Sequence, residues 1–483
     1  MKPSELSFRR RFSVNLYKTL RLDVGEMSMF KDWVSDKRGD PYPLMMKTGD
    51  ITERVSGAKY TVSSEKGGKV ARLLGGFFPI YTYEFQIRDT ENCSMGFLLE
   101  SGDKKLSVML ENSENAVVSA ENEYYEVDCK AKRGDVCSVT FRRGGLSLYI
   151  KRDTRPELIC DVSVRALDDF ARYDVFSEAT VSLVTEIHGK GKARYSDVSF
   201  YLCGGISHAD MKPMKYEDGT PIIENGRVYL TMSSRLETGC YQSVVSWNPT
   251  LCDFKLEGAM LFDVGDGFCE SDVAASVVYD RNAKEWYIWY CSFSHDHVLA
   301  RGRIKGDPRF GVQIIDSELL PLWSGRDRTE FAGVPGDEDP DLCFIDGKWH
   351  LTVCRLEDDR SYHYYHFISD EPFDNFKFVD RTETGDKTGG MMTKVEDVYY
   401  FVCGTDFESR ANYDVYKYDD FSKREKLVCN YDDGGYRGWG TVFGMYVGTR
   451  KKYYWITFDR HNASDWNWSY GNIYVYESKE WFK

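Results

Sequence analysis

At 483 residues the chain is longer than one hydrophobic core usually serves, so its length predicts two domains. Lys and Arg total 63 against 77 Asp and Glu, giving a formal net charge of -14, and no long basic stripe is present. This balance argues against nucleic acids and anionic membranes as partners. The sequence has neither an apolar N-terminal leader segment nor a run of about 18 uncharged apolar residues. We therefore expect a soluble, cytoplasmic protein.

Aromatic residues make up 15% of the chain, whereas Pro occurs only 13 times. This composition favours many strands and predicts an all-β protein. The 13 Cys are scattered without a CxxC pair, and several lie inside apolar runs. Neither zinc nor disulfide spacing is present, so we expect free structural thiols in a reducing compartment.

The first domain is expected to span residues 1–203. Between Ile51 and Leu202, period-two alternation in segments such as YTYEFQIRD, KLSVMLEN and TVSLVTEIHG is interrupted by turn residues. Such alternation predicts an antiparallel β-sandwich, concanavalin-like or jelly-roll-like, preceded by an irregular N-terminal segment.

The second domain is expected to span residues 204–483. Five copies of a loose unit follow one another here, each with a turn leading into an aromatic strand. The clearest pieces are ENGRVYLTMSS, DRNAKEWYIWYCSF, IDGKWHLTVCR, KVEDVYYFVCG and GTRKKYYWITFDR. Their recurrence every 50 to 60 residues or so is the spacing of four-stranded blades, and five units predict a five-bladed β-propeller.

Acidic residues precede the innermost strands of three predicted blades. They are Asp210, then Glu270 and Asp272, then Glu338, Asp339 and Asp341. The fourth and fifth entrances, KTGGMM and RGWGTVF, carry no carboxylate. Because innermost strands of a propeller surround one axis, these acids are expected to converge on a common pocket.

At these positions the chain resembles the five-bladed-propeller glycoside hydrolases of families 43, 32 and 117, over roughly residues 207–483. The resemblance implies that Asp210 is the general base that activates water and that Asp339 orients and tunes the acid. Where family 43 has its general-acid Glu, this chain has Thr388, Gly389 and Gly390. That role therefore cannot be transferred.

Glu270 is the substitute acid that we favour, because crowding by Asp272 and apolar Phe268 could raise its pKa. The alternative is that Glu270 only binds sugar hydroxyls.

Further polar and aromatic residues follow or open the predicted inner strands and are expected at the pocket rim, where they would bind substrate together with Asp272 and Asp341. They are His295, His297, Arg235, Arg355, Trp439, Asp459, Arg460 and His461.

The sequence thus predicts a glycoside hydrolase, acting from a chain end on an imported oligosaccharide, by carboxylate acid and base catalysis. One alternative is a metal-dependent sugar deacetylase on the same scaffold. In it, Glu270, His295 and His297 would surround a divalent ion such as calcium, manganese or zinc. The other alternative is a carbohydrate-binding protein without catalysis.

Overall fold

The computed structural model describes residues 1–26, 42–153, 156–268, 272–325, 327–404, 412–428, 440–459 and 471–482. The protein is all-β, as the composition predicts. Helix in the described residues is limited to short turns: η1 (Pro3–Glu5), α1 (Ala166–Asp169) and α2 (Tyr173–Phe176). None of these is long and apolar enough to cross a membrane. The described cysteines are free thiols.

The chain forms two compact units. Residues 21–203 form the first, called the sheet unit, and residues 1–20 together with 204–483 form the second, called the ring unit. The sequence-based division placed residues 1–20 in the first domain. In the structure they belong to the ring unit because β1 (Phe8–Val14) pairs antiparallel with β35 (Ile473–Ser478), near the other end of the chain.

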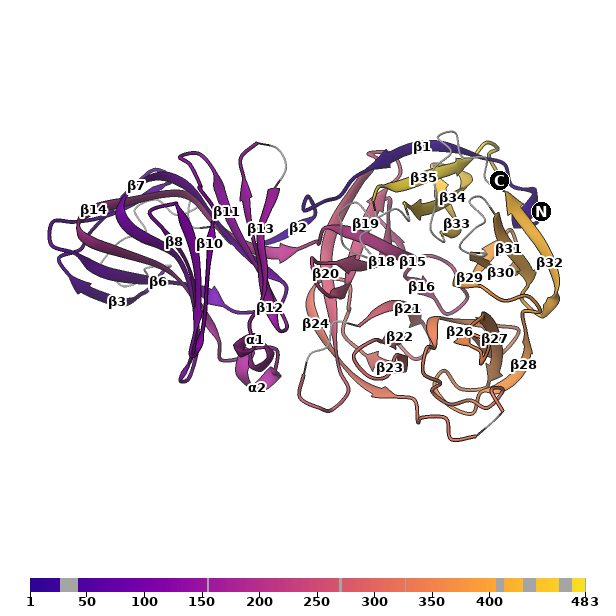
Figure 1. Ribbon diagram of the computed structural model, residues 1–483. Coiled ribbons are helices and arrows are strands. Elements are labelled where there is room, and N and C mark those ends of the chain that lie inside the picture. The colour runs from indigo at the N-terminus through magenta and orange to yellow at the C-terminus, as the bar shows by residue number, and fades with distance from the viewer. Residues whose placement is uncertain are drawn as a thin grey trace. The chain divides into compact units, whose positions relative to one another are not determined.

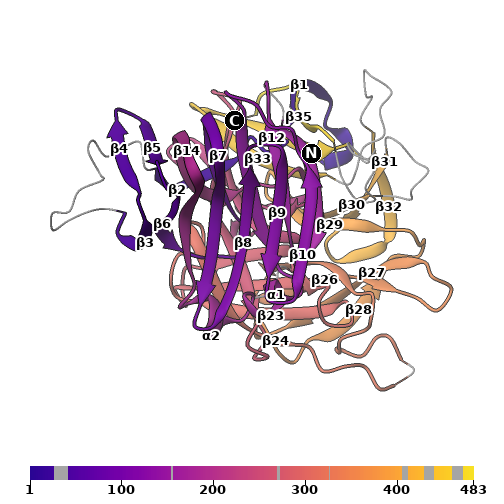
Figure 2. The ribbon, with the colours of Figure 1, turned by 60° about the vertical axis from the view of Figure 1, so that its left-hand side comes forward.

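The sheet unit is built on two long strands, β7 (Tyr81–Ser101) and β14 (Thr180–Cys203), which pair along most of their length. Around them lie β2 (Arg21–Glu26), β3 (Leu44–Gly49), β4 (Thr52–Ser56), β5 (Lys59–Ser64), β6 (Gly68–Gly76), β8 (Lys104–Glu111), β9 (Asn115–Ala120), β10 (Glu123–Asp128), β11 (Val136–Arg142), β12 (Gly145–Lys151) and β13 (Pro156–Ser163). Figure 2 shows β14, β7, β8, β9 and β10 side by side. Tyr83, Phe85 and Ile87 alternate with less buried residues along β7, the period that an antiparallel strand with one buried face requires.

The ring unit consists of five successive groups of four strands. Group 1 is β15 (Ser207–Pro213), β18 (Arg227–Arg235), β19 (Cys240–Asn248) and β20 (Asp253–Asp263), with β16 (Lys215–Tyr216) and β17 (Ile223–Glu224) between its first two strands. Group 2 is β21 (Val273–Asp280), β22 (Glu285–Ser292), β23 (Val298–Ile304) and β24 (Gly311–Leu319). Group 3 is β25 (Glu338–Ile345), β26 (Lys348–Leu356), β27 (Tyr362–Ser369) and β28 (Lys377–Arg381). Group 4 is β29 (Thr388–Val395), β30 (Val398–Gly404), β31 (Asn412–Lys417) and β32 (Asp420–Val428). Group 5 is β33 (Thr441–Val447), β34 (Arg450–Phe458), β35 and β1.

The groups surround one centre (Figure 1). The first strand of each group packs against the first strand of the next, and β33 packs against β15, so the ring closes. Each of the five pieces recognised in the sequence contains the second strand of a group, namely β18, β22, β26, β30 and β34. Aromatic side chains fill the junctions between groups, as where Trp247 of group 1 meets Tyr454 of group 5 with ring centroids 4.9 Å apart.

A buried ion pair ties four of these groups together at the centre. The Lys215 ammonium donates to both carboxylate oxygens of Asp341 at 2.7 Å, and the side chains are only 1% and 2% exposed. Asp341 also accepts from Ser276 Oγ at 2.9 Å and from the Met392 amide at 2.7 Å. The carboxylate of group 3 thereby contacts β16, β21 and β29.

Replacing Lys215 with Met should therefore leave a buried carboxylate without its cation and destabilise the ring unit by about 3–5 kcal/mol. Urea unfolding measures the loss. The matched control is Lys348→Met, which removes a cation from an exposed pair with Asp370 and should cost less than about 1 kcal/mol. Equal effects of the two changes would contradict a central role for the Lys215–Asp341 pair.

A buried imidazole in β15 predicts how stability depends on pH. His208 is 2% exposed, and its Nε2–H donates to the Gly204 carbonyl at 2.6 Å. Burial lowers the pKa of His208 from 6.5 to about 4, although the hydrogen bond to Gly204 opposes this shift. The folded protein therefore holds His208 neutral over a range in which the unfolded chain takes up a proton.

The pKa of His208 is lower in the folded protein than in the unfolded chain. The contribution of neutral His208 to the free energy of unfolding is therefore complete above about pH 6.5. It is lost as the pH falls towards 4, at up to ~1.4 kcal/mol per pH unit. Urea unfolding of the ring unit at several pH values should show a smaller decline in His208→Gln than in the wild type. His188→Gln changes an exposed imidazole of the sheet unit and should leave that decline unchanged. A pH dependence unaltered by His208→Gln would contradict the prediction.

Candidate functional site

The first strands of four groups share a β-bulge at the same register position. In β15 the pairing with β18 jumps from Ala209 to Lys212, and equivalent jumps occur in β21, β25 and β29. The first residue inside each bulge has a positive φ: Asp210 at 53°, Ala274 at 61°, Asp339 at 46° and Gly389 at 59°. The register therefore makes these four residues equivalent.

Left-handed backbone in a non-glycine residue costs of order 1–3 kcal/mol and persists only where surrounding structure enforces it. Bulges re-aim a side chain relative to the strand that carries it. Asp210 and Asp339 thus occupy equivalent strained positions on groups 1 and 3. Groups 2 and 4 place the small residues Ala274 and Gly389 there. Asp272, which the sequence aligned with these acids, lies two residues before the bulge position.

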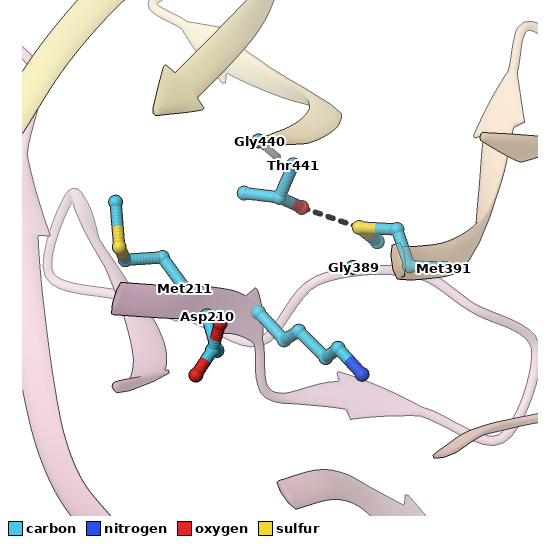
Figure 3. A pocket seen from close by; sticks show the side chains of 7 residues that line it. Asp210, Met211, Gly389, Met391, Gly440 and Thr441 are labelled. Carbon is cyan, nitrogen blue, oxygen red and sulfur yellow. Dashed lines mark hydrogen bonds between the residues drawn. The ribbon is translucent and has the colours of Figure 1, made fainter. Parts of the chain in front are cut away.

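Asp210 lines a small cavity at the ring centre, formed by the first strands of groups 1, 4 and 5 (Figure 3). Its volume is about 10 Å³, room for about one water molecule. The lining residues are Asp210, Met211, Lys212, Gly389, Met391, Gly440 and Thr441. Thr441 Oγ1 donates to the Met391 sulfur and fixes one wall. Asp210 is itself 8% exposed, so its carboxylate is largely removed from bulk water.

Asp339 is held from the neighbouring group. Its Oδ2 accepts from the Gly389 amide at 2.8 Å and from Thr388 Oγ1 at 2.9 Å. Burial raises the pKa of Asp339 above its usual range. The Lys212 ammonium lowers that pKa, and the Glu338 carboxylate raises it. The segment at which family 43 would supply an acid thus fixes the orientation of Asp339 here.

Lys212 is a component that the sequence reasoning missed. It is 4% exposed, lines the same cavity as Asp210, and donates from Nζ to the Pro340 carbonyl at 2.9 Å. The available signal was its position two residues after Asp210, close to a predicted site residue. Its burial depends on packing between groups, which the local sequence does not reveal.

Groups 2 and 3 carry further carboxylates just before or at the start of their first strands. Asp272 is 1% exposed and accepts from the Ser294 amide at 3.1 Å and from Ser294 Oγ at 2.7 Å. Burial raises the pKa of the Cys291 thiol, and Glu338, Asp272 and Asp339 all raise it further. These three acids therefore lie around one buried thiol.

The two predicted rim histidines each face a carboxylate. His295 has Nδ1 3.0 Å from Ser292 Oγ and Nε2 3.2 Å from Asp266 Oδ2. His297 has Nε2 3.1 Å from Glu338 Oε1 and stacks against Phe293 with ring centroids 4.2 Å apart. Across the described part of the chain, no group of three or more His, Cys, Asp or Glu side chains could hold a metal ion.

Two residues predicted to bind substrate are committed to buried ion pairs. Asp341 holds Lys215, as described above. Arg355 is 1% exposed, and its Nε and Nη2 each donate to Asp337 at 3.0 Å, while further donors reach the carbonyls of Glu330 and Ala332. With their polar atoms engaged inside the protein, both residues belong to the framework rather than to a ligand site.

The remaining predicted residues lie at strand ends. Arg235 ends β18 and pairs with Ser207 at the start of β15, so it stands at the same end of group 1 as Asp210. Asp459 follows β34, and its Oδ2 accepts from the Asn472 amide at 3.1 Å and from Tyr474 Oη at 3.2 Å. Four predicted site residues lie outside the described residues: Glu270, Trp439, Arg460 and His461.

The sequence matches no protein-family model and no curated protein. The structure is similar to solved structures of propeller glycoside hydrolases, as the sequence resemblance predicts. One is a family 43 β-1,3-galactosidase with galactodeoxynojirimycin, at 12% identity and a TM-score of 0.36, covering 58% of this chain and 91% of that one. Another is a family 117 glycoside hydrolase of the marine bacterium Zobellia galactanivorans, at 12% identity and a TM-score of 0.37, covering 56% and 90%. The carbohydrate-binding module CBM66 of Bacillus subtilis is also similar, at 12% identity and a TM-score of 0.24, covering 33% and 94%.

The thiol of Cys240 offers a test of the site that needs no substrate. Cys240 is half-buried, and burial raises its pKa to about 11. The Arg235 cation lowers that pKa, and Asp272 and Asp210 raise it. Asp210→Asn or Asp272→Asn should therefore lower the thiol pKa by about half a unit or more, and Arg235→Gln should raise it.

The pH dependence of alkylation, followed by peptide mass spectrometry, measures this pKa. Cys252, which lies elsewhere in group 1 between β19 and β20, is the internal control and should react alike in all variants. A Cys240 titration that is the same in the wild type and all three variants would show that these charges do not share one site.

Proposed function

We propose that this protein is a glycoside hydrolase whose ring unit is a five-bladed β-propeller with its active centre between Asp210 and Asp339. The observation that carries the proposal is the repeated bulge, which puts these two aspartates at equivalent strained positions, with Asp210 beside a cavity the size of one water molecule. The sequence resemblance of residues 207–483 to propeller glycosidases supports the same chemistry. The sheet unit is proposed to be a β-sandwich that binds carbohydrate.

In this proposal, Asp210 is the general base. Its carboxylate takes a proton from a water molecule as the water oxygen attacks the anomeric carbon, and the bond to the leaving oxygen breaks. The cavity beside Asp210 suits a single positioned water. Asp339, buried and bonded to Gly389 and Thr388, tunes the acid and orients it without itself transferring the proton.

The leaving oxygen needs a proton. In group 4 the position equivalent to Asp210 and Asp339 is Gly389, which has no side chain to donate one. Glu270 remains the proposed acid, from the segment just before Asp272. A second proposed source is the His297–Glu338 pair, with 3.1 Å between Nε2 and Oε1. Both side chains are partly exposed, at 28% and 26%, although Nε2 of His297 is itself buried.

Action from a chain end on an imported oligosaccharide in the cytoplasm is part of the same proposal, because a centre walled by five groups favours a pocket over an open cleft. A second candidate is carbohydrate binding without catalysis, which the missing carboxylate at Gly389 favours. The third candidate, a metal-dependent sugar deacetylase, would use Glu270, His295 and His297. Of these, both histidines already face carboxylates of the protein, Asp266 and Glu338.

Asp210→Asn tests the catalytic proposal. Asn tolerates positive φ as Asp does, so the bulge should survive, while the amide cannot accept the proton of water. We expect kcat to fall at least ~10²-fold, with ligand binding and stability nearly unchanged. Turnover of a panel of nitrophenyl glycosides and oligosaccharides, with and without chelator, measures the effect.

Asp316→Asn is the matched control, since Asp316 is exposed on β24 of the same unit and should retain full activity. Full activity in Asp210→Asn, or activity that chelator abolishes, would favour the metal-dependent candidate. Binding without turnover across the whole panel would favour the non-catalytic one.

A further inference from the structure

Lys212 carries a buried ammonium group, and burying such a charge costs several kcal/mol unless opposite charges and hydrogen bonds compensate. One hydrogen bond reaches the Pro340 carbonyl at 2.9 Å. Pro340 follows Asp339 inside the bulge of β25, so this bond ties β15 to the segment that presents Asp339.

The register shows why a cation at this position matters. Two residues beyond each bulge residue, pairing resumes at Lys212, Ser276, Asp341 and Met391. At two of these positions the side chains meet between groups, because Ser276 Oγ donates to Asp341 at 2.9 Å. In group 1 the equivalent position is held by Lys212, whose ammonium group lies next to the bulge that carries Asp339.

Two carboxylates at the bulge of β25 repel one another. Asp339 feels the adjacent Glu338 carboxylate, and burial already disfavours its charged form. Asp210 lines the same cavity as Lys212. Lys212 contacts the bulge of β25 through Pro340 and lies two residues beyond Asp210 in the bulge of β15. From this single position its charge can offset the repulsion.

We propose that Lys212 is a positioning residue which holds Asp339 near the cavity that Asp210 lines, by bonding the Pro340 carbonyl and by offsetting the repulsion between Asp339 and Glu338. The inference rests on the proposed function for its catalytic meaning. The effect of the Lys212 charge on Asp339 does not depend on that function and can be measured without a substrate.

Lys212→Met keeps the length of the side chain and removes the charge. Because the cation holds the pKa of Asp339 down, its loss should raise that pKa by about one unit or more. The acidic limb of the kcat/KM profile should then move to higher pH by the same amount, with about tenfold less activity below it. Lys212→Arg retains the charge and should keep the limb in place.

The matched control is Lys452→Met. Lys452 is also buried, at 1% exposure, and donates to the backbone carbonyl of Ser478 at 2.5 Å, but it lies on β34 and not on a bulged first strand. Lys452→Met should lower the stability of the protein and leave the pH profile of kcat/KM unchanged. If Lys212→Met does not fold, Lys212→Gln, which keeps a donor for Pro340 without a charge, replaces it.

A second measurement keeps the inference testable without turnover. Carbon-13 NMR of protein labelled at the Asp side-chain carboxyls, with the Asp339 signal assigned by Asp339→Asn, reports the titration of Asp339 directly. A raised pKa in Lys212→Met with no turnover in the wild type would support the role of Lys212 and reject the glycosidase. An unchanged Asp339 titration would overturn the inference whether or not the protein is an enzyme.

Discussion

The ring unit depends on one buried ion pair. Asp341 of group 3 receives the Lys215 ammonium, the Ser276 hydroxyl and the Met392 amide, so a single carboxylate bonds elements of four groups. A carboxylate can be buried this deeply only when its lone pairs are satisfied. That requirement fixes the register of β21, β25 and β29 around the centre. The aromatic junctions between groups add apolar burial, but burial alone does not set which residues face the axis.

Once that register is fixed, the bulges act together. Each inserts a left-handed residue at the same depth, and the four residues alternate between acid and small around the ring: Asp210, Ala274, Asp339 and Gly389. Lys212 bonds the Pro340 carbonyl beside Asp339 and lowers the pKa of Asp339, and the Gly389 amide and Thr388 hydroxyl hold Asp339 in place. The bulge residues Asp210 and Asp339 therefore lie two residues from the buried charges of Lys212 and Asp341 on the same strands.

Sequence reasoning predicted the all-β composition and located the second strand of every group, because the turn and aromatic strand recur in each. It also singled out Asp210 and Asp339, which the structure places at equivalent bulge positions. It missed what depends on distant pairing. The partner of β1 is β35, and no local pattern reveals that pairing. In group 2 the bulge position is held by Ala274, two residues after the predicted Asp272. Arg355 and Asp341 resemble ligand-binding residues in sequence, and only their buried partners Asp337 and Lys215 show otherwise.

The central claim is that a sugar is held between Asp210 and Asp339 for attack by water. The most direct test is a crystal structure of the Asp210→Asn protein soaked with the oligosaccharide that the wild type degrades fastest. The account predicts a terminal sugar at the ring centre, with its anomeric carbon facing residue 210 across one water molecule and Asp339 within reach of the same ring. A sugar bound only to the sheet unit, or only at positions remote from both aspartates, would contradict it.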